Sequence, residues 1–192
     1  MHPLVQWFRI SDTEQTRDWP DGWSVGQSDD GWFDLEDLAV LTAHLRVATR
    51  TPDDPVIGAW GGTGNPPCAE GGPNALARAH MQMPWPGRGT GLFSSRLREL
   101  ADPTWEHRTV PGWACSRPGQ DGPYTFLIWP ENHPWVVASE GNLDSTIVAG
   151  SRTLVDDVLA DDRFEAFEVH EGDDLSWDGD PLNARRPPGP EH

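Results

Sequence analysis

The chain has 192 residues and a formal net charge of −17, from 31 acidic and 14 basic side chains. Neutralisation of phosphates by Lys and Arg supplies most of the affinity of proteins for nucleic acids, so this charge excludes DNA and RNA as expected ligands and disfavours anionic membrane surfaces. The length fits one domain, and the 20 glycines and 19 prolines favour many turns over a helical bundle.

The first 32 residues are polar and rich in turn-forming residues. A short strand is predicted at 7–10, and the remainder of 1–32 is expected to be irregular and to wrap around the domain. The side chains of Trp19, Trp23 and Trp32 are its expected anchors, because tryptophan buries a large apolar area.

A helix is predicted to begin after Asp34, a favourable N-cap residue that has Asp37 at the capping-box position. The Thr51-Pro52 pair is expected to stop it, because a residue that precedes proline disfavours helix. Its apolar residues recur at helical spacing: Leu35, Leu38, Leu41, Leu45 and Ala48.

A short buried strand is predicted at 56–60, where it ends on Trp60, and a flexible loop follows at 61–73. This loop is rich in glycine. A phosphate-binding loop also needs a lysine and a following helix, and neither is present before the prolines. We therefore interpret it as a plain connecting loop.

Residues 74–100 have the least regular spacing of apolar residues in the chain. Asn74 is expected to cap a short helix that reaches Met81 or Met83, and a turn is predicted at 84–87. The stretch 92–100 fits either a helix or a strand, because its leucines recur at helical spacing while nearby glycines permit an extended chain.

Alternating and apolar runs then predict a set of strands. The turn between the last two strands is expected at Gly141 and Asn142. The predicted strands lie at 124–129, 135–140 and 146–149.

Thr153 is expected to cap a second helix, with Asp156 at the capping-box position. Its predicted buried face consists of Leu154, Val155, Val158 and Leu159. A last strand is predicted at 164–169. Residues 179–192 have little to bury and are expected to be disordered, which leaves a single domain at 1–178. The elements together predict an α+β fold: a mostly antiparallel sheet with two or three helices packed on one side, ending in a hairpin-helix-strand unit.

Three segments share their order and spacing with a known pattern: TRTPDDPVIGAWGG at 49–62, PWPGRGTGLF at 84–93, and LIWPENHPWVVASEGNLDSTIVAGSRTLVDDVL at 127–159. In these segments the chain resembles an uncharacterised family of actinobacterial proteins. The family pattern has a second tryptophan before the position of Trp129 and a basic residue at the position of Pro134. The resemblance implies one cytoplasmic α+β domain and carries no catalytic residues to this chain.

The densest group of candidate functional residues lies between 129 and 146. Glu140 and Asp144 flank a tight turn, and paired carboxylates can divide acid and base roles when their surroundings separate their pKa values. Nearby tryptophans can supply flat surfaces for a sugar or another ring. The candidate binding residues are Trp60, Trp129, Trp135, Glu140, Asp144, Ser145 and Thr146.

The same residues also have a structural explanation. Asp144, Ser145 and Thr146 can satisfy backbone groups of a turn. The tryptophans can belong to the core and its rim. Only a pocket shared by the tryptophans and the carboxylates would favour the functional interpretation.

The acids gather in two runs: 12–37 holds nine acids and one arginine, and 156–180 holds eleven acids and one arginine. Acidic faces steer basic partners, although solubility alone is another explanation. The leading hypothesis is a non-catalytic, immunity-like or regulatory protein that binds a basic protein. The alternative is a small-molecule-binding module or hydrolase built from the candidate residues.

No metal or cofactor is expected, because Cys68 and Cys115 form no CxxC pair and no two histidines have metal-ligand spacing. The pairing of the two cysteines is left open. No stretch approaches the roughly 20 apolar residues of a membrane-spanning helix, and the first residues lack a signal-like pattern. A cytoplasmic location is therefore expected.

Overall fold

The computed structural model describes residues 16–26, 30–53, 55–60, 81–85, 88–102, 126–140 and 143–176, together with positions 5, 7, 28, 179–180 and 182–183. These residues contain two helices, α2 (Leu35–Val47) and α5 (Arg152–Leu159), and a 3-10 turn, η1 (Leu97–Glu99). The strands are β1 (Thr16–Asp18), β2 (Ser24–Gly26), β3 (Pro55–Trp60), β4 (Met81–Trp85), β5 (Arg88–Ser94), β6 (Phe126–Pro130), β7 (Trp135–Ser139) and β8 (Thr146–Gly150).

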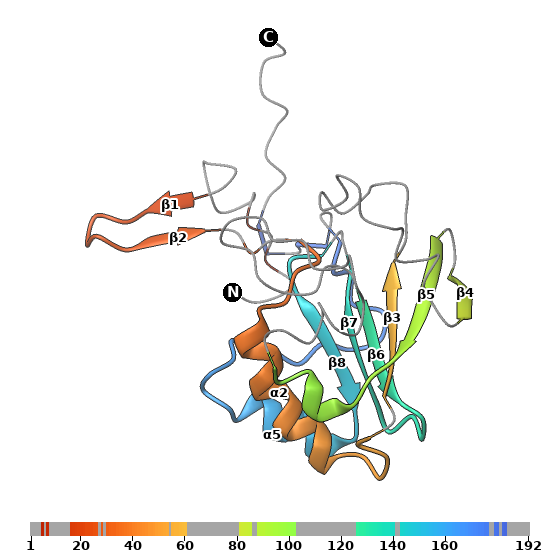
Figure 1. The fold of residues 1–192 in the computed structure, drawn as a ribbon. Helices are drawn as coiled ribbons and strands as arrows, with labels where there is room; N and C mark the ends of the chain where they lie inside the picture. The colour runs from red at the N-terminus through yellow and green to blue at the C-terminus, as the bar shows by residue number, and fades with distance from the viewer. Residues whose placement is uncertain are drawn as a thin grey trace.

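The main sheet has six strands in the order β4-β5-β3-β6-β7-β8, and every neighbouring pair is antiparallel. Strands β1 and β2 form a separate two-stranded sheet. Figure 1 shows α2 and α5 together beside the β6–β8 part of the sheet, and it shows the β1–β2 hairpin extending away from this body. The predicted α+β class and the antiparallel sheet are confirmed.

Helix α2 forms where the sequence predicts it. The Asp34 carboxylate accepts a hydrogen bond of 2.7 Å from the Glu36 amide and so caps the first turn. Acidic residues in the first turn and basic residues in the last turn both interact favourably with the helix dipole. Its buried stripe consists of Leu35, Leu38, Leu41 and Leu45.

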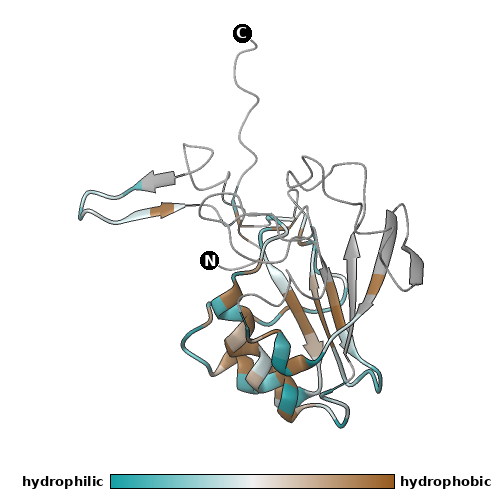
Figure 2. Ribbon diagram, in the orientation of Figure 1, coloured by the Kyte–Doolittle hydropathy of each residue, from teal (hydrophilic) through white to brown (hydrophobic). Residues whose placement is uncertain are grey.

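The core lies between this stripe and one face of the sheet. Ile128 and Val137, which pair across β6 and β7, are fully buried together with Leu154 of α5. Figure 2 shows hydrophobic residues along β6, β7 and β8 and hydrophilic residues along the loops beside them. Burial of each such side chain contributes roughly 1.5–3 kcal/mol, so this interface is the main source of stability.

Two polar contacts tie α2 to the sheet. The indole of Trp135 donates a hydrogen bond of 3.1 Å to the carbonyl of Leu45, in the last turn of the helix, where carbonyls lack helical partners. After the helix, the hydroxyls of Thr49 and Thr51 each donate to Asn132 Oδ1 at 2.8 Å. The helix end is thereby joined to both ends of the β6–β7 turn.

Some predicted elements differ in type. Met81 and Met83 lie in β4 and not in a helix, and Pro84 and Trp85 belong to the same strand. A residue before proline disfavours helix, and β4 is an edge strand, where proline is tolerated. The ambiguous stretch 92–100 divides into the end of β5 and the turn η1. The predicted helix from Asn74 otherwise lies outside the described residues.

The end of the domain also departs from expectation. Helix α5 is capped by Ser151, whose hydroxyl accepts from the Leu154 amide at 3.3 Å, so it begins before the predicted cap at Thr153. The predicted strand at 164–169 is coil. Phe164 packs on the core while Phe167 is exposed, so the side chains alternate, although no strand in the described part of the chain pairs with this backbone.

The predicted strand at 7–10 is wrong at Trp7, which is helical and buried, and its other positions lie outside the described residues. Within 1–32, which is expected to be irregular, the β1–β2 hairpin is regular structure. In the predicted disordered tail, Asp180 is buried and its carboxylate accepts hydrogen bonds from the amides of Leu182 and Asn183, both at 2.9 Å.

Candidate functional site

The β1–β2 hairpin, which we name the Trp hairpin (residues 16–26), has a turn built from Pro20, Asp21 and Gly22. The Gly22 amide donates to the Trp19 carbonyl at 2.9 Å, and Gly22 has φ of 92°, which glycine adopts without steric cost. Proline followed by Asp-Gly is a favourable sequence for such a turn. The turn is therefore specified by its own residues.

Trp19 and Trp23 lie directly opposite each other where the strands meet this turn. The Trp19 amide donates to the Trp23 carbonyl at 2.7 Å, which extends the register of Asp18 with Ser24. Directly opposite residues of an antiparallel pair project to the same face, and so does Val25, two positions after Trp23. The exposed fractions are 44% for Trp19, 71% for Trp23 and 44% for Val25. These three apolar residues are thus exposed on one face, and the same register places Arg17 opposite Val25.

The Trp hairpin also carries carboxylates, although Asp18, which pairs with Ser24, projects to the face opposite the tryptophans. Asp18 and Asp21 are exposed, and Asp21 Oδ1 also accepts from the Trp23 amide at 3.4 Å. The expected role of Trp19 and Trp23 as buried anchors is therefore wrong. The Trp hairpin instead presents exposed aromatic side chains, and it carries two exposed acids.

A second acidic surface follows α5. We name residues 156–174 the acidic segment, which holds nine acids and one arginine. Phe167 is 41% exposed within it. Its exposed acids are Asp156, Asp157, Asp162, Glu165, Glu168, Glu171, Asp173 and Asp174.

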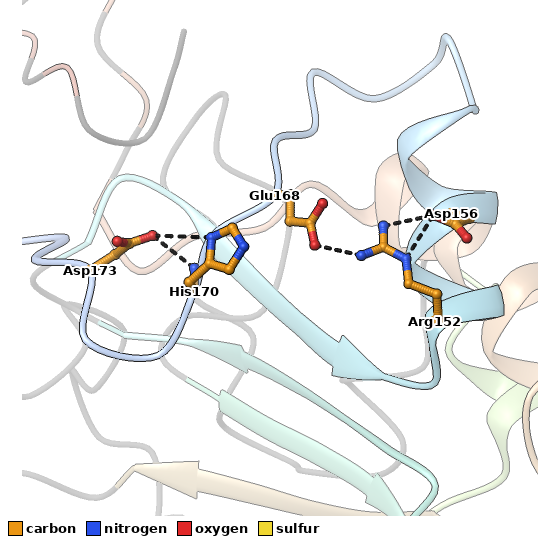
Figure 3. Close-up of polar contacts among 5 residues, drawn as sticks. All are labelled: Arg152, Asp156, Glu168, His170 and Asp173. Atoms are coloured by element: carbon orange, nitrogen blue, oxygen red, sulfur yellow. Dashed lines mark hydrogen bonds and ion pairs between the residues drawn. The ribbon is translucent and has the colours of Figure 1, made fainter.

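Arg152 anchors part of the acidic segment, as Figure 3 shows. Its guanidinium donates to Asp156 at 2.6 and 2.9 Å and to Glu168, and these contacts lower the pKa of both carboxyl groups. Farther along, the His170 amide donates to Asp173 at 2.7 Å. These contacts fix the path of the chain after α5, and those with Arg152 favour the ionised forms of Asp156 and Glu168.

Asp161 fixes the start of the same segment to α2. Its carboxylate lies 2.8 Å from His44 Nε2 and accepts two guanidinium bonds from Arg163, at 2.6 and 2.8 Å. The hydrogen bonds from Arg163, and then that from His44, hold the pKa of Asp161 well below its usual range. His44 and Asp161 are far apart in sequence, and no spacing rule could have paired them.

The structure brings part of the predicted site together at the β7–β8 end (residues 139–146). Glu140, Asp144, Ser145 and Thr146 are all half-buried there. The Glu140 carbonyl accepts from the Leu143 amide at 2.9 Å, and the Leu143 carbonyl accepts from the Gly31 amide at 2.8 Å. The turn is thus held against the segment that precedes α2.

Burial raises the pKa of Asp144, and its own backbone hydrogen bond partly opposes that effect. Ser139 and Thr146 pair across β7 and β8, and their hydroxyl oxygens are buried without a hydrogen-bond partner among the described residues. The β7–β8 end therefore contains buried polar groups.

The predicted tryptophans are divided between the two ends of the sheet. Trp60 ends β3 on the side of the β7–β8 end, since Ala59 aligns with Phe126 and Phe126 with Ser139. Trp135 is at the far end of β7, roughly 13 Å from Ser139 at the rise of an extended strand. Its indole is 3% exposed and bonded within the core, while Trp129 is half-buried on β6.

The residues missed by sequence reasoning are those of the Trp hairpin. The signal was present, because Trp-Pro-Asp-Gly-Trp places turn residues between two residues that favour strands. Cys68 and Cys115 lie outside the described residues.

Within the described ranges, no group of three or more His, Cys, Asp or Glu side chains is arranged to hold a metal ion. No helix among these residues is long and apolar enough to cross a bilayer. Comparison with protein-family models, curated proteins and solved structures gives no significant match to this chain.

Proposed function

We propose that this protein is a non-catalytic, immunity-like or regulatory binding protein that recognises a basic protein partner in the cytoplasm. The observation that carries this proposal is the placement of Trp19 and Trp23 on one exposed face of an acidic hairpin. Tryptophan is enriched among residues that dominate binding energy, and its exposure on a projecting element is costly unless a partner covers it.

The acidic segment supports the same function. Its carboxylates are exposed over a continuous stretch, and contacts with Arg152 and Arg163 compensate only part of their charge. Together with a net charge of −17, this surface attracts a cationic protein over a distance of about a Debye length, roughly 8–10 Å at moderate salt. Electrostatic attraction then raises the rate of association, and the exposed tryptophans provide apolar area that is buried in the complex.

The first experiment is affinity capture from a lysate of the organism that encodes the protein, with elution at low and then high salt. The proposal expects a basic protein that is retained at low salt and released by high salt. The matched control is a variant with exposed acids neutralised: Asp157→Asn, Asp162→Asn and Glu171→Gln. Equal capture by this variant and by the wild-type protein contradicts an electrostatic role for the acidic segment.

A second candidate function is a small-molecule site at the β7–β8 end. The specific observation in its favour is the pair of buried, unpartnered hydroxyls of Ser139 and Thr146, next to a turn that contains Asp144 with its raised pKa. Buried polar groups without partners are uncommon in proteins, and a ligand or a water can satisfy them. Glu140→Gln should then abolish ligand binding while the protein remains folded.

A further inference from the structure

We infer that the open edge of strand β2 in the Trp hairpin pairs with the same edge of a second copy of this chain. Within the described residues, β2 has β1 as its one neighbouring strand, so its other edge is unpaired there. All three residues of β2 are exposed. An exposed edge presents amide and carbonyl groups to which another strand can pair. The inference concerns this edge and does not depend on the basic partner.

The hydrogen bonds of the hairpin show which groups of β2 face the open edge. The Trp19 amide donates to the Trp23 carbonyl at 2.7 Å, so these residues form a hydrogen-bonded pair. Hydrogen-bonded and non-hydrogen-bonded pairs alternate along an antiparallel ladder. Ser24, which follows Trp23 and aligns with Asp18, therefore belongs to a non-hydrogen-bonded pair. Its amide and carbonyl point away from β1, toward the open edge.

The outward groups of β2 are self-complementary. When two β2 strands lie antiparallel about a twofold axis at Ser24, each Ser24 amide can donate to the Ser24 carbonyl of the other copy. The same register sets Trp23 of one copy opposite Val25 of the other, and these side chains are 71% and 44% exposed in the single chain. Aromatic and β-branched residues form favourable cross-strand pairs. The two hairpins would thus join into one four-stranded sheet, which is more stable than a two-stranded one.

The distribution of charge favours β2 over β1 as the pairing edge. Residues 22–27 contain no charged side chain and no proline, whereas β1 contains Arg17 and Asp18 and is closely followed by Pro20. Charges and proline commonly protect an exposed edge against pairing. The net charge of −17 opposes the approach of two copies. Figure 1 shows the hairpin extending away from the body, which lessens the repulsion because salt screens charges beyond about 8–10 Å.

The expected dimer is weak, and its response to salt is distinctive. The edge is short, and interfaces that bury less than about 1,200 Å² in total are commonly transient. Because the two copies repel each other, added salt should strengthen the dimer. Added salt should weaken the binding of a basic partner. The two kinds of association can therefore be distinguished in the same buffers.

The test is sedimentation velocity of the full chain from about 20 µM to about 1 mM, at about 50 mM and about 300 mM NaCl. We expect the weight-average sedimentation coefficient to exceed that of a non-pairing variant as concentration rises, with a larger excess at the higher salt. Proton–nitrogen spectra over the same concentrations should show shifts centred on the amides of 23–26.

Ser24→Pro is the non-pairing variant. It removes the outward amide without removing a hydrogen bond between β1 and β2, and it leaves the net charge unchanged. The matched control is Thr16→Pro, because the amide of Thr16 points away from β2 by the same alternation. This control should associate like the wild-type chain. Amide signals of the hairpin report whether each variant keeps its two strands paired.

Equal sedimentation of wild type and Ser24→Pro, with the hairpin intact, overturns the inference. Loss of association in Thr16→Pro would assign the pairing to the other edge and also overturn it. If Ser24→Pro loses the hairpin, Ser24→Asp and Ser24→Lys decide: neither should associate alone, and their mixture should associate, because opposite charges then meet at the axis. A mixture that does not associate contradicts the inference. Shifts of the β2 amides only on addition of a basic protein captured from the lysate would assign the edge to that partner, which overturns the second copy and leaves the proposed function standing.

Discussion

The main-chain amide of Trp19 donates a hydrogen bond of 2.7 Å to the carbonyl oxygen of Trp23. That bond places both indoles on one face, just before a turn specified by Pro20, Asp21 and Gly22. Neither tryptophan serves the core, which is filled by leucines of α2 and apolar residues of β6 and β7. The hydrophobic core and the exposed indoles therefore belong to separate parts of the chain.

The bond between Trp135 and Leu45 gives the first prediction. Trp135→Phe should lower the free energy of unfolding by about 1–3 kcal/mol, because a buried carbonyl at the end of α2 loses its donor. Denaturant titration at neutral pH measures this change. Trp129→Phe is the control, since Trp129 is half-buried on β6, and its effect should be smaller. An equal loss in both variants would contradict a specific role for the indole N–H.

Close packing at the start of α5 gives the second prediction. A Cβ atom added at Gly150 would lie 2.8 Å from Leu154 Cδ2 and 3.1 Å from Trp135 Cβ. Gly150→Ala should therefore destabilise the fold by about 1–3 kcal/mol through overpacking. Ala149→Ser, at the exposed neighbouring position, should change stability by less than about 0.5 kcal/mol. Thermal unfolding of both variants under the same conditions measures this difference in stability.

Asp144 gives a prediction with a defined pH dependence. Its folded pKa is raised above 3.8 by burial, so the folded state favours the neutral acid. Stability from this group is present at low pH and is lost as the pH rises from 3.8 through the folded pKa. Asp144→Asn should thus raise the melting temperature at pH 7 and leave it nearly unchanged in strong acid. A lower melting temperature at pH 7 would show that the ionised carboxylate has a stabilising partner.

Ser139 and Thr146 test whether the β7–β8 end holds a ligand. With nothing bound, the double change Ser139→Ala and Thr146→Val removes two unsatisfied hydroxyls and should be neutral or stabilising, within about 1 kcal/mol. Mass spectrometry of the purified wild-type protein would then show no retained small molecule. Loss of a retained molecule in the double variant would instead support the second candidate function.

Local sequence patterns predicted much of the fold. The leucine spacing after Asp34 located α2, and alternation located β6, β7 and β8, because one-sided burial imposes the period of each element. The prediction was wrong where contacts with distant segments determine the local structure. Residues 164–169 alternate like a strand, yet no strand among the described residues pairs with them, and Glu168 instead contacts Arg152.

The candidate site was predicted only in part. Glu140, Asp144, Ser145 and Thr146 lie around one turn, whereas Trp135 is buried in the core, where its indole bonds Leu45. Residues that are close in sequence can still lie at opposite ends of one strand, as Trp135 and Ser139 do in β7. Similarly, His44 and Asp161 meet only because α2 packs beside the chain that leaves α5.

The central claim is that charge brings a basic protein to this chain. Its most direct test is the dissociation constant of the captured basic protein at about 50 mM and about 300 mM NaCl, for the wild-type chain and for the variant neutralised at Asp157, Asp162 and Glu171. The account predicts weaker binding at high salt, and weaker binding by the neutralised variant at low salt. An affinity that changes with neither salt nor neutralisation would contradict it.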